Sequence, residues 1–217
     1  MSAPRLVIFD VNETMFSLHR LEPVFAAVGL DPATLPLWFA RTLRDGFALC
    51  AAGDYRPFAE VATATLRGLG ADVAGAAQIL GAFRELDPHP DVEPALRLLA
   101  AAGVRVATLT VGSAQVTGAL LARAGLSAYV EQCLSADAVR RWKPAREPYL
   151  YAVEQAGVAP GEAALVAAHS WDVHGARRAG LRTGWVSRLE GVPITSFAGA
   201  DVRGDTLDEV VSALLAD

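Results

Sequence analysis

Four groups of reactive side chains follow apolar stretches in this sequence. They are DVNET from Asp10 to Thr14, TVGS from Thr110 to Ser113, Lys143-Pro144 with Tyr149 nearby, and AAHSWD from Ala167 to Asp172. A carboxylate can attack an electrophilic atom as a nucleophile or bind a hard cation. A nearby lysine can keep that carboxylate ionised, and hydroxyl groups can donate hydrogen bonds to it. The four groups together predict a site built around one carboxylate.

Asp10 is the carboxylate best placed for chemistry. It follows the apolar run Leu6–Phe9, whose β-branched members favour a buried strand. Open α/β sheets bind their ligands at the carboxyl ends of their strands. Asp10 is therefore a candidate nucleophile, metal ligand or both, and the simpler reading is a turn former or helix cap after the strand.

The rest of the sequence supplies the elements that would hold these groups. Strand-like runs end near five residues, which are Phe9, Leu109, Leu134, Ala167 and Val186. Helical patterns separate or follow the later runs, at 91–102, 114–124, 146–157, 173–179 and 206–215. Alternating strands and helices form parallel sheets with helices on both faces. The predicted fold class is a doubly wound, Rossmann-like α/β domain.

A long stretch between the first two strands lacks a convincing strand pattern. It contains four helical segments, at 18–28, 33–52, 55–69 and 73–84. A crossover of this length exceeds what a single helix needs, so we expect an inserted helical cap at 16–87. The core would then comprise 1–15 and 88–217, with Pro88 and Pro90 stiffening the return.

The overall composition narrows the classes of partner. The net charge of −5 argues against a nucleic-acid surface. The two cysteines, Cys50 and Cys133, have no metal-like spacing and fit a reducing compartment without disulfides. The sequence shows neither a signal peptide pattern nor an apolar run of the roughly 20 residues that span a membrane. These features predict a soluble, cytoplasmic protein, and they leave phosphate or carboxylate substrates possible.

The order and spacing of the four groups resemble the haloacid dehalogenase superfamily over nearly the whole chain. The details are most similar to the type II L-2-haloacid dehalogenases. Phosphatases of the superfamily carry a second aspartate where this chain has Asn12, and a metal-binding acid where it has Ala168. A hard dication prefers several oxygen ligands, mostly carboxylates. The sequence therefore favours chemistry that requires no metal or other cofactor.

The resemblance also implies roles for individual side chains. Asp10 would attack the carbon that carries the halogen and form an ester, which water then hydrolyses. Lys143 would keep Asp10 ionised, and Asp172 would orient Lys143 and the water. Tyr149 matches a tyrosine that the family places beside the site. Hydroxyl groups of Thr14 and Thr110 and backbone N–H groups at Val111 and Gly112 would bind the nucleophile or the substrate carboxylate. The family often forms homodimers.

The chain departs from the family pattern at several positions. The family's halide-binding arginine follows a tryptophan, but Trp38 is followed by Phe39. Arg41 lies two positions further along, which turns a helical side chain by about 200°. The family's asparagine after the motif-two hydroxyl is Val111 here, and the serine and asparagine of the fourth motif correspond to Ala167 and His169. His169 could replace that asparagine and act as a general base.

The favoured hypothesis is a hydrolytic dehalogenase of small 2-haloacids, with Asn12, Phe39 and Arg41 among its substrate-binding residues. A Mg²⁺-dependent phosphatase of the same superfamily is the first alternative, and Ala168 argues against it. A non-catalytic relative that binds a small anion or a partner protein is the second, and Val111 and Phe39 support it. The leaving group and the stereochemistry of the substrate are left open.

Overall fold

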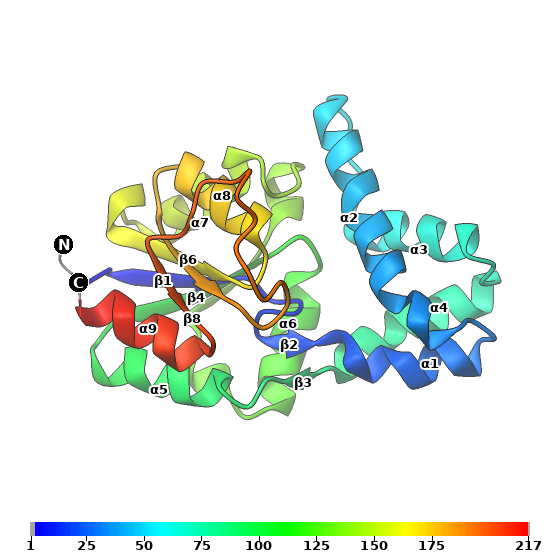
Figure 1. The fold of residues 1–217 in the computed structure, drawn as a ribbon, viewed down its shortest axis with the longest axis horizontal. Coiled ribbons are helices and arrows are strands. Elements are labelled where there is room, and N and C mark those ends of the chain that lie inside the picture. The colour runs from blue at the N-terminus through cyan, green and yellow to red at the C-terminus, as the bar shows by residue number, and fades with distance from the viewer. Residues whose placement is uncertain (1–2, 217) are drawn as a thin grey trace.

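A computed structural model describes residues 3–216 and contains one six-stranded parallel sheet (Figure 1). The strand order is β5-β4-β1-β6-β7-β8. The strands are β1 (Leu6–Phe9), β4 (Arg105–Thr110), β5 (Gln132–Ser135), β6 (Ala163–Ala167), β7 (Arg182–Val186) and β8 (Val202–Gly204). The first strand lies in the middle of the sheet, between β4 and β6. This arrangement confirms the predicted doubly wound α/β fold.

Helices cover both faces of this sheet. They are α5 (Val92–Ala101), α6 (Ala114–Arg123), α7 (Arg146–Ala156), α8 (Ser170–Arg178) and α9 (Leu207–Ala216). Alternate residues of β1 serve opposite faces, because side chains of a strand alternate in direction. Val7 and Phe9 belong to the core that includes residues of α5, α6 and α9. Leu6 and Ile8 belong to the core that includes residues of α7 and α8.

A second group of helices lies to one side of the sheet, between β1 and α5 in the sequence (Figure 1). They are α1 (Glu22–Ala27), α2 (Leu35–Ala51), α3 (Phe58–Gly68) and α4 (Val73–Ala82). A two-stranded antiparallel ribbon stands at the entrance and exit of this group. It pairs β2 (Phe16–Ser17) with β3 (Asp87–Pro88). The ribbon supports the predicted cap at 16–87, whose boundaries remain a prediction.

Three short strands were not predicted from the sequence. The strands β2 and β3 have two residues each, and β8 has three. The edge strand β8 pairs in parallel with β7, from Gly184 opposite Val202 to Val186 opposite Gly204. Runs this short show no measurable hydrophobic alternation. None of the helices within residues 3–216 is both long and apolar enough to cross a bilayer.

Helix α2 approaches the chain just before Lys143 closely, and a glycine permits the contact. A Cβ atom added to Gly46 would lie 2.4 Å from the ring of Trp142. The Trp142 indole donates a hydrogen bond to the carbonyl oxygen of Arg56 at 2.9 Å. Helix α2 and the segment that carries Lys143 therefore pack against each other at Trp142.

We expect Gly46→Ala to lower the free energy of unfolding by about 1–3 kcal/mol, because the added methyl group overpacks the contact with Trp142. Urea denaturation measures the change. Gly118→Ala is the matched control, since it also lies within a helix and its added Cβ meets no atom within 4 Å. That substitution is expected to leave stability equal or up to about 1 kcal/mol higher. Equal losses in both variants would contradict the role of the close contact.

Candidate active site

The carboxyl ends of β1, β4 and β6 bring three of the predicted groups together, because these strands are neighbours in the sheet, and Lys143 of the fourth group comes from the segment between β5 and α7. The backbone N–H of Asp10 donates to the carbonyl oxygen of Val166 at 3.0 Å, which extends the register of β1 against β6 by one residue. The Asp10 side chain thus emerges at the tip of the central strand. It is almost completely buried, as are Lys143, His169 and Asp172.

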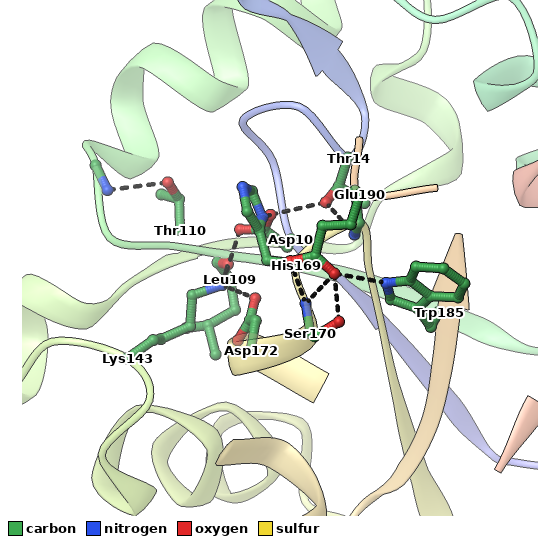
Figure 2. A network of polar contacts seen from close by, with 12 residues as sticks. Asp10, Thr14, Leu109, Thr110, Lys143, His169, Ser170, Asp172, Trp185 and Glu190 are labelled. Carbon is green, nitrogen blue, oxygen red and sulfur yellow. Dashed lines mark hydrogen bonds and ion pairs between the residues drawn. The ribbon is translucent and has the colours of Figure 1, made fainter. Parts of the chain in front are cut away.

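Lys143 connects the two carboxylates of the site (Figure 2). Its Nζ donates to Oδ1 of Asp10 at 2.8 Å, to Oδ2 of Asp172 at 2.6 Å, and to the carbonyl oxygen of Leu109 at 2.9 Å. An ammonium group has three N–H donors. All three are used within the protein, so Lys143 holds the carboxylates in place and retains no N–H for a ligand in this arrangement.

The charges around Lys143 shift the pKa values of the site. Burial alone would raise the pKa of Asp10, but Lys143 and His169 bring it well below its usual range. Burial would lower the pKa of Lys143, and the two neighbouring carboxylates raise it instead. Burial raises the pKa of Asp172, and the charge of Asp10 adds to this effect against the attraction of Lys143. Asp10 is therefore the ionised carboxylate available for attack.

Two further side chains bind Oδ2 of Asp10. The hydroxyl of Thr14 donates to this oxygen at 2.7 Å and accepts the backbone N–H of Ala168 at 2.9 Å. Nδ1 of His169 lies 3.2 Å from the same oxygen. The structure therefore brings two of the predicted site residues, Thr14 and His169, into contact with Asp10. Phosphatases of the superfamily carry an acid at the position of Ala168. Here the backbone N–H of Ala168 donates a hydrogen bond to Thr14.

Tyr149, in α7, contacts the site through Asp172. Its hydroxyl donates to Oδ1 of Asp172 at 2.6 Å and lies 3.2 Å from the carbonyl oxygen of that residue. Burial raises the pKa of Tyr149 well above its usual value, and the charge of Asp172 acts in the same direction. Asp172 lies in the first turn of α8, whose N-cap is His169. The Tyr149 hydroxyl therefore fixes the orientation of the Asp172 carboxylate.

The second group of predicted residues, Thr110 to Ser113, forms a hydrogen-bonded loop beside the start of α6. The hydroxyl of Thr110 accepts the backbone N–H of Gly112 at 2.9 Å, so it braces its own loop. Ser113 is the N-cap of α6, and its hydroxyl accepts the N–H of Val116 at 3.4 Å. Val111 is buried, with 6% of its surface exposed. The loop therefore presents backbone and small polar groups next to a helix N-terminus.

Two cavities flank the Asp10 loop. The first, which we call the Asn12 cavity, measures about 130 Å³ and includes Asn12, Thr110, Gly112 and Ser113 in its lining. The second, which we call the His169 cavity, measures about 430 Å³. Its lining residues are Glu13, Ser17, Leu18, His19, Glu22, Leu35, Pro36, Phe39, Ala40, Leu43, His169 and Leu189. The predicted residues Asn12 and Phe39 therefore line different cavities.

Aromatic rings hold His169 in place. Its imidazole packs against the rings of Trp171 and Phe39, at centroid distances of 5.1 Å and 6.2 Å. Arg41 is not among the described residues that line either cavity. Arg44 is largely exposed and forms an ion pair with Asp45 at 2.7 Å. The structure thus brings Phe39 to the site and does not bring these two arginines to it.

Glu13 is a neighbour of the site that sequence reasoning passed over. It lines the His169 cavity, and its Oε1 accepts the backbone N–H of Leu18 at 2.9 Å. Burial raises the pKa of Glu13. Its φ of 61° places a non-glycine residue in the left-handed region, which is uncommon and clusters at functional sites. The signal in the sequence was a charged residue directly before Thr14.

The fold and the site define a Rossmann-like α/β protein with a helical layer inserted after its first strand and a buried carboxylate–lysine pair at the tip of that strand. The family model of haloacid dehalogenase-like hydrolases matches residues 4–180, and the chain belongs to that family. Within the family it is similar to the (S)-2-haloacid dehalogenases, so the predicted resemblance is confirmed.

Three similar proteins illustrate this relationship. The chain is 28% identical to an (S)-2-haloacid dehalogenase of Pseudomonas sp. (strain YL), covering 97% of this chain and 91% of that one. It is 27% identical to haloacetate dehalogenase H-2 of Moraxella sp. (strain B), covering 84% and 85%. A crystal structure of a dehalogenase with an intermediate complex superposes with a TM-score of 0.88 at 28% identity, covering 100% of this chain and 99% of that chain.

Proposed function

We propose that the protein hydrolyses small 2-haloacids to 2-hydroxy acids and halide, through an ester on Asp10. The observation that carries the proposal is the ion pair of Lys143 with Asp10 at 2.8 Å, at the tip of the central strand. This contact keeps Asp10 ionised in a buried site, as a carboxylate nucleophile requires. The names of the similar proteins, which are dehalogenases of haloacetate and (S)-2-haloacids, support the same reaction.

In the first step, an oxygen of Asp10 attacks the carbon that bears the halogen. A carbon–oxygen bond forms while the carbon–halogen bond breaks, and the halogen leaves as halide with the bonding electron pair. Attack from the side opposite the leaving group inverts the configuration at this carbon. Halide requires no protonation when it leaves, so the step does not need the general acid that phosphatases of the superfamily carry at the position of Asn12.

In the second step, water attacks the carboxyl carbon of the Asp10 ester. The ester bond breaks on the Asp10 side, which releases the 2-hydroxy acid and regenerates the carboxylate. The products of the full cycle are the 2-hydroxy acid, one halide and one proton. Lys143 and Asp172 orient the reacting groups around this carbon. Lys143 donates hydrogen bonds to the carboxylates of Asp10 and Asp172, and the Tyr149 hydroxyl donates to Asp172 and holds its side chain in place.

The carboxylate of the substrate would bind in the Asn12 cavity. This cavity includes Ser113 at the N-terminus of α6, and helix N-termini favour anions through their unpaired N–H groups. Its volume of about 130 Å³ suits a short acid. Thr110 contributes by shaping the loop, since its hydroxyl already binds Gly112.

The test of the function is halide release from both enantiomers of 2-chloropropionate and from haloacetates, with EDTA present. We expect one halide and one 2-hydroxy acid for each substrate molecule, at a rate that EDTA does not change. A protein that releases no halide from any of these acids would overturn the proposal. Phosphate ester hydrolysis that requires Mg²⁺ would favour the phosphatase alternative instead.

Three features that we propose for this protein are supported by the sequence and the family resemblance alone. These are the boundaries of the cap, the homodimer and the cytoplasmic location. Size-exclusion chromatography with light scattering tests the homodimer directly.

A further inference from the structure

The segment between α2 and α3 meets the α/β core at Tyr55. The Tyr55 hydroxyl donates a hydrogen bond to Oδ1 of Asp137, which lies in the 3₁₀ turn Ala136–Val139 after β5. The guanidinium of Arg140, at the end of that turn, lies 5.1 Å from the centre of the Tyr55 ring, within the range of a cation–π contact. One side chain of the helical layer (α1–α4) therefore contacts two residues of the core.

The neighbouring residue of the same segment has its own contact with the core. The carbonyl oxygen of Arg56 accepts the hydrogen bond of the Trp142 indole at 2.9 Å. Loss of the Tyr55 hydroxyl alone should therefore loosen the segment without detaching it. A substitution at Tyr55 can be studied in a folded protein for this reason.

The Tyr55–Asp137 hydrogen bond stands at the wall of the Asn12 cavity. Asp137 lines this cavity from the core. Pro57, Phe58 and Ala59 line it from the helical layer, and they lie two to four positions after Tyr55 in the sequence. The hydrogen bond thus joins a core residue of the cavity wall to the segment that supplies the opposite part of the wall.

Asp137 is also connected to the loop from Thr110 to Ser113. Its backbone N–H donates to the hydroxyl of Ser135 at 3.1 Å, and that hydroxyl donates to the carbonyl oxygen of Gly112 at 2.6 Å. Gly112 lines the same cavity. Contacts therefore lead from Tyr55 through Asp137 and Ser135 to the loop beside the N-terminus of α6, where the substrate carboxylate would bind.

We propose that Tyr55 is a positioning residue, which holds the helical layer closed over the Asn12 cavity through Asp137 and so sets the affinity for the substrate. The inference rests on the proposed function for the identity of that substrate. Among the described residues, the Tyr55 hydroxyl bonds Asp137 and neither Asp10 nor Lys143. Its loss lowers the fraction of molecules with a closed cavity, which weakens the apparent affinity and leaves the chemical step unchanged.

The experiment compares wild type with Tyr55→Phe, which removes only the hydroxyl. The dissociation constant of propionate, an acid without a leaving group, is measured by titration calorimetry. Single-turnover halide release from 2-bromopropionate is measured over a range of substrate concentrations. We expect Tyr55→Phe to raise the propionate Kd and the half-saturating substrate concentration about three- to tenfold, within the scale of one hydrogen bond to a charged group. The rate at saturation should change less than about twofold, as for a loss of uniform binding.

Tyr151→Phe is the matched control. Tyr151 lies in α7, and its hydroxyl forms no hydrogen bond within residues 3–216. This variant should bind propionate as wild type does. An unchanged propionate Kd in Tyr55→Phe would overturn the inference. A slower rate at saturation with an unchanged Kd would also overturn it, because Tyr55 would then affect the chemistry or the amount of folded enzyme.

A double-mutant cycle with Asp137→Ala tests the partner. Asp137→Ala also removes a negative charge from the cavity wall, and the cycle cancels this effect because the charge is absent from both variants in that background. Tyr55→Phe should weaken propionate binding in the wild-type background and have little further effect beside Asp137→Ala. An equal loss in both backgrounds would contradict the role of the Tyr55–Asp137 contact.

Hydrogen exchange gives a measurement that needs no turnover and no ligand. The backbone amides of residues 55–62 should exchange faster in Tyr55→Phe than in wild type and in Tyr151→Phe. Equal exchange in the three proteins would count against the closure of the cavity by Tyr55. If wild type releases no halide from any haloacid, the proposed function fails, whereas exchange and propionate binding still decide the role of Tyr55.

Discussion

Asp10→Asn is expected to lower single-turnover halide release from a good 2-haloacid substrate by about 10⁴-fold or more. An amide oxygen is a poor nucleophile, and loss of a covalent nucleophile has effects of this scale. The fold should persist, because the amide oxygen can still accept the hydrogen bond that Lys143 donates to Asp10. Rapid quench with ion chromatography measures the released halide, and intact mass verifies that the asparagine has not deamidated.

Isotope labelling shows whether Asp10 is the nucleophile. In a single turnover in H₂¹⁸O with enzyme in excess, water attacks the Asp10 carboxyl carbon, so the label should enter Asp10. Peptide mass spectrometry locates it. The label should be absent from the 2-hydroxy acid, and its appearance there would show that water attacks the substrate directly. Asp54→Asn is the matched control for the substitution, since Asp54 is exposed and should leave the rate unchanged.

Lys143→Met is expected to lower the free energy of unfolding by about 3–5 kcal/mol at pH 7, the cost of removing one partner of a buried ion pair. Methionine fills a similar space but leaves Asp10 and Asp172 buried together without a cation. Halide release should fall as well, because Asp10 loses the cation that lowers its pKa. Urea denaturation at several pH values measures the change in stability.

The loss should shrink as the pH falls. In wild type, the pKa of Asp10 is lowered, so the stability from its ionisation is present above the ordinary aspartate value of about 3.9 and is lost only as the pH drops towards the folded value. In Lys143→Met, the two facing carboxylates raise each other's pKa and take up a proton at higher pH. The difference from wild type should therefore be smaller at pH 5 than at pH 7.

A double variant gives the control for this reading. Lys143→Met combined with Asp172→Asn leaves one carboxylate in place of two, so we expect it to recover part of the lost stability but not the activity. A stability difference that stays constant between pH 7 and pH 5 would contradict the electrostatic explanation. It would point instead to the packing of the lysine side chain.

The main framework of the site could be predicted because it follows from strand ends. Asp10, Lys143 and Asp172 lie far apart in the sequence, yet parallel strands bring their carboxyl ends to one edge of a sheet. Apolar runs mark those strands clearly. The strands β2, β3 and β8 left no comparable pattern, because two or three residues are too few to show a period.

The finer geometry could not be predicted, because it depends on which direction a side chain takes. Thr110 was expected at the nucleophile or the substrate, but its hydroxyl binds the backbone of its own loop. Helical spacing indicated that Arg41 points away from the position of Phe39, but it could not show what either side chain faces. Nε2 of His169 is buried without a hydrogen-bond partner among residues 3–216, and this follows from packing that includes Trp171 and Phe39, which no sequence pattern indicates.

The β2–β3 ribbon has a consequence for how this protein can diverge. Phe16 and Pro88 are paired, although the helices α1–α4 separate them in the sequence. A segment whose ends meet at one point can be lengthened, shortened or replaced without shifting the register of any strand in the main sheet. Phe39 belongs to this segment, whereas Asp10 and Lys143 lie outside it. Mutation can therefore alter the choice of substrate while the nucleophile and its cation are inherited unchanged.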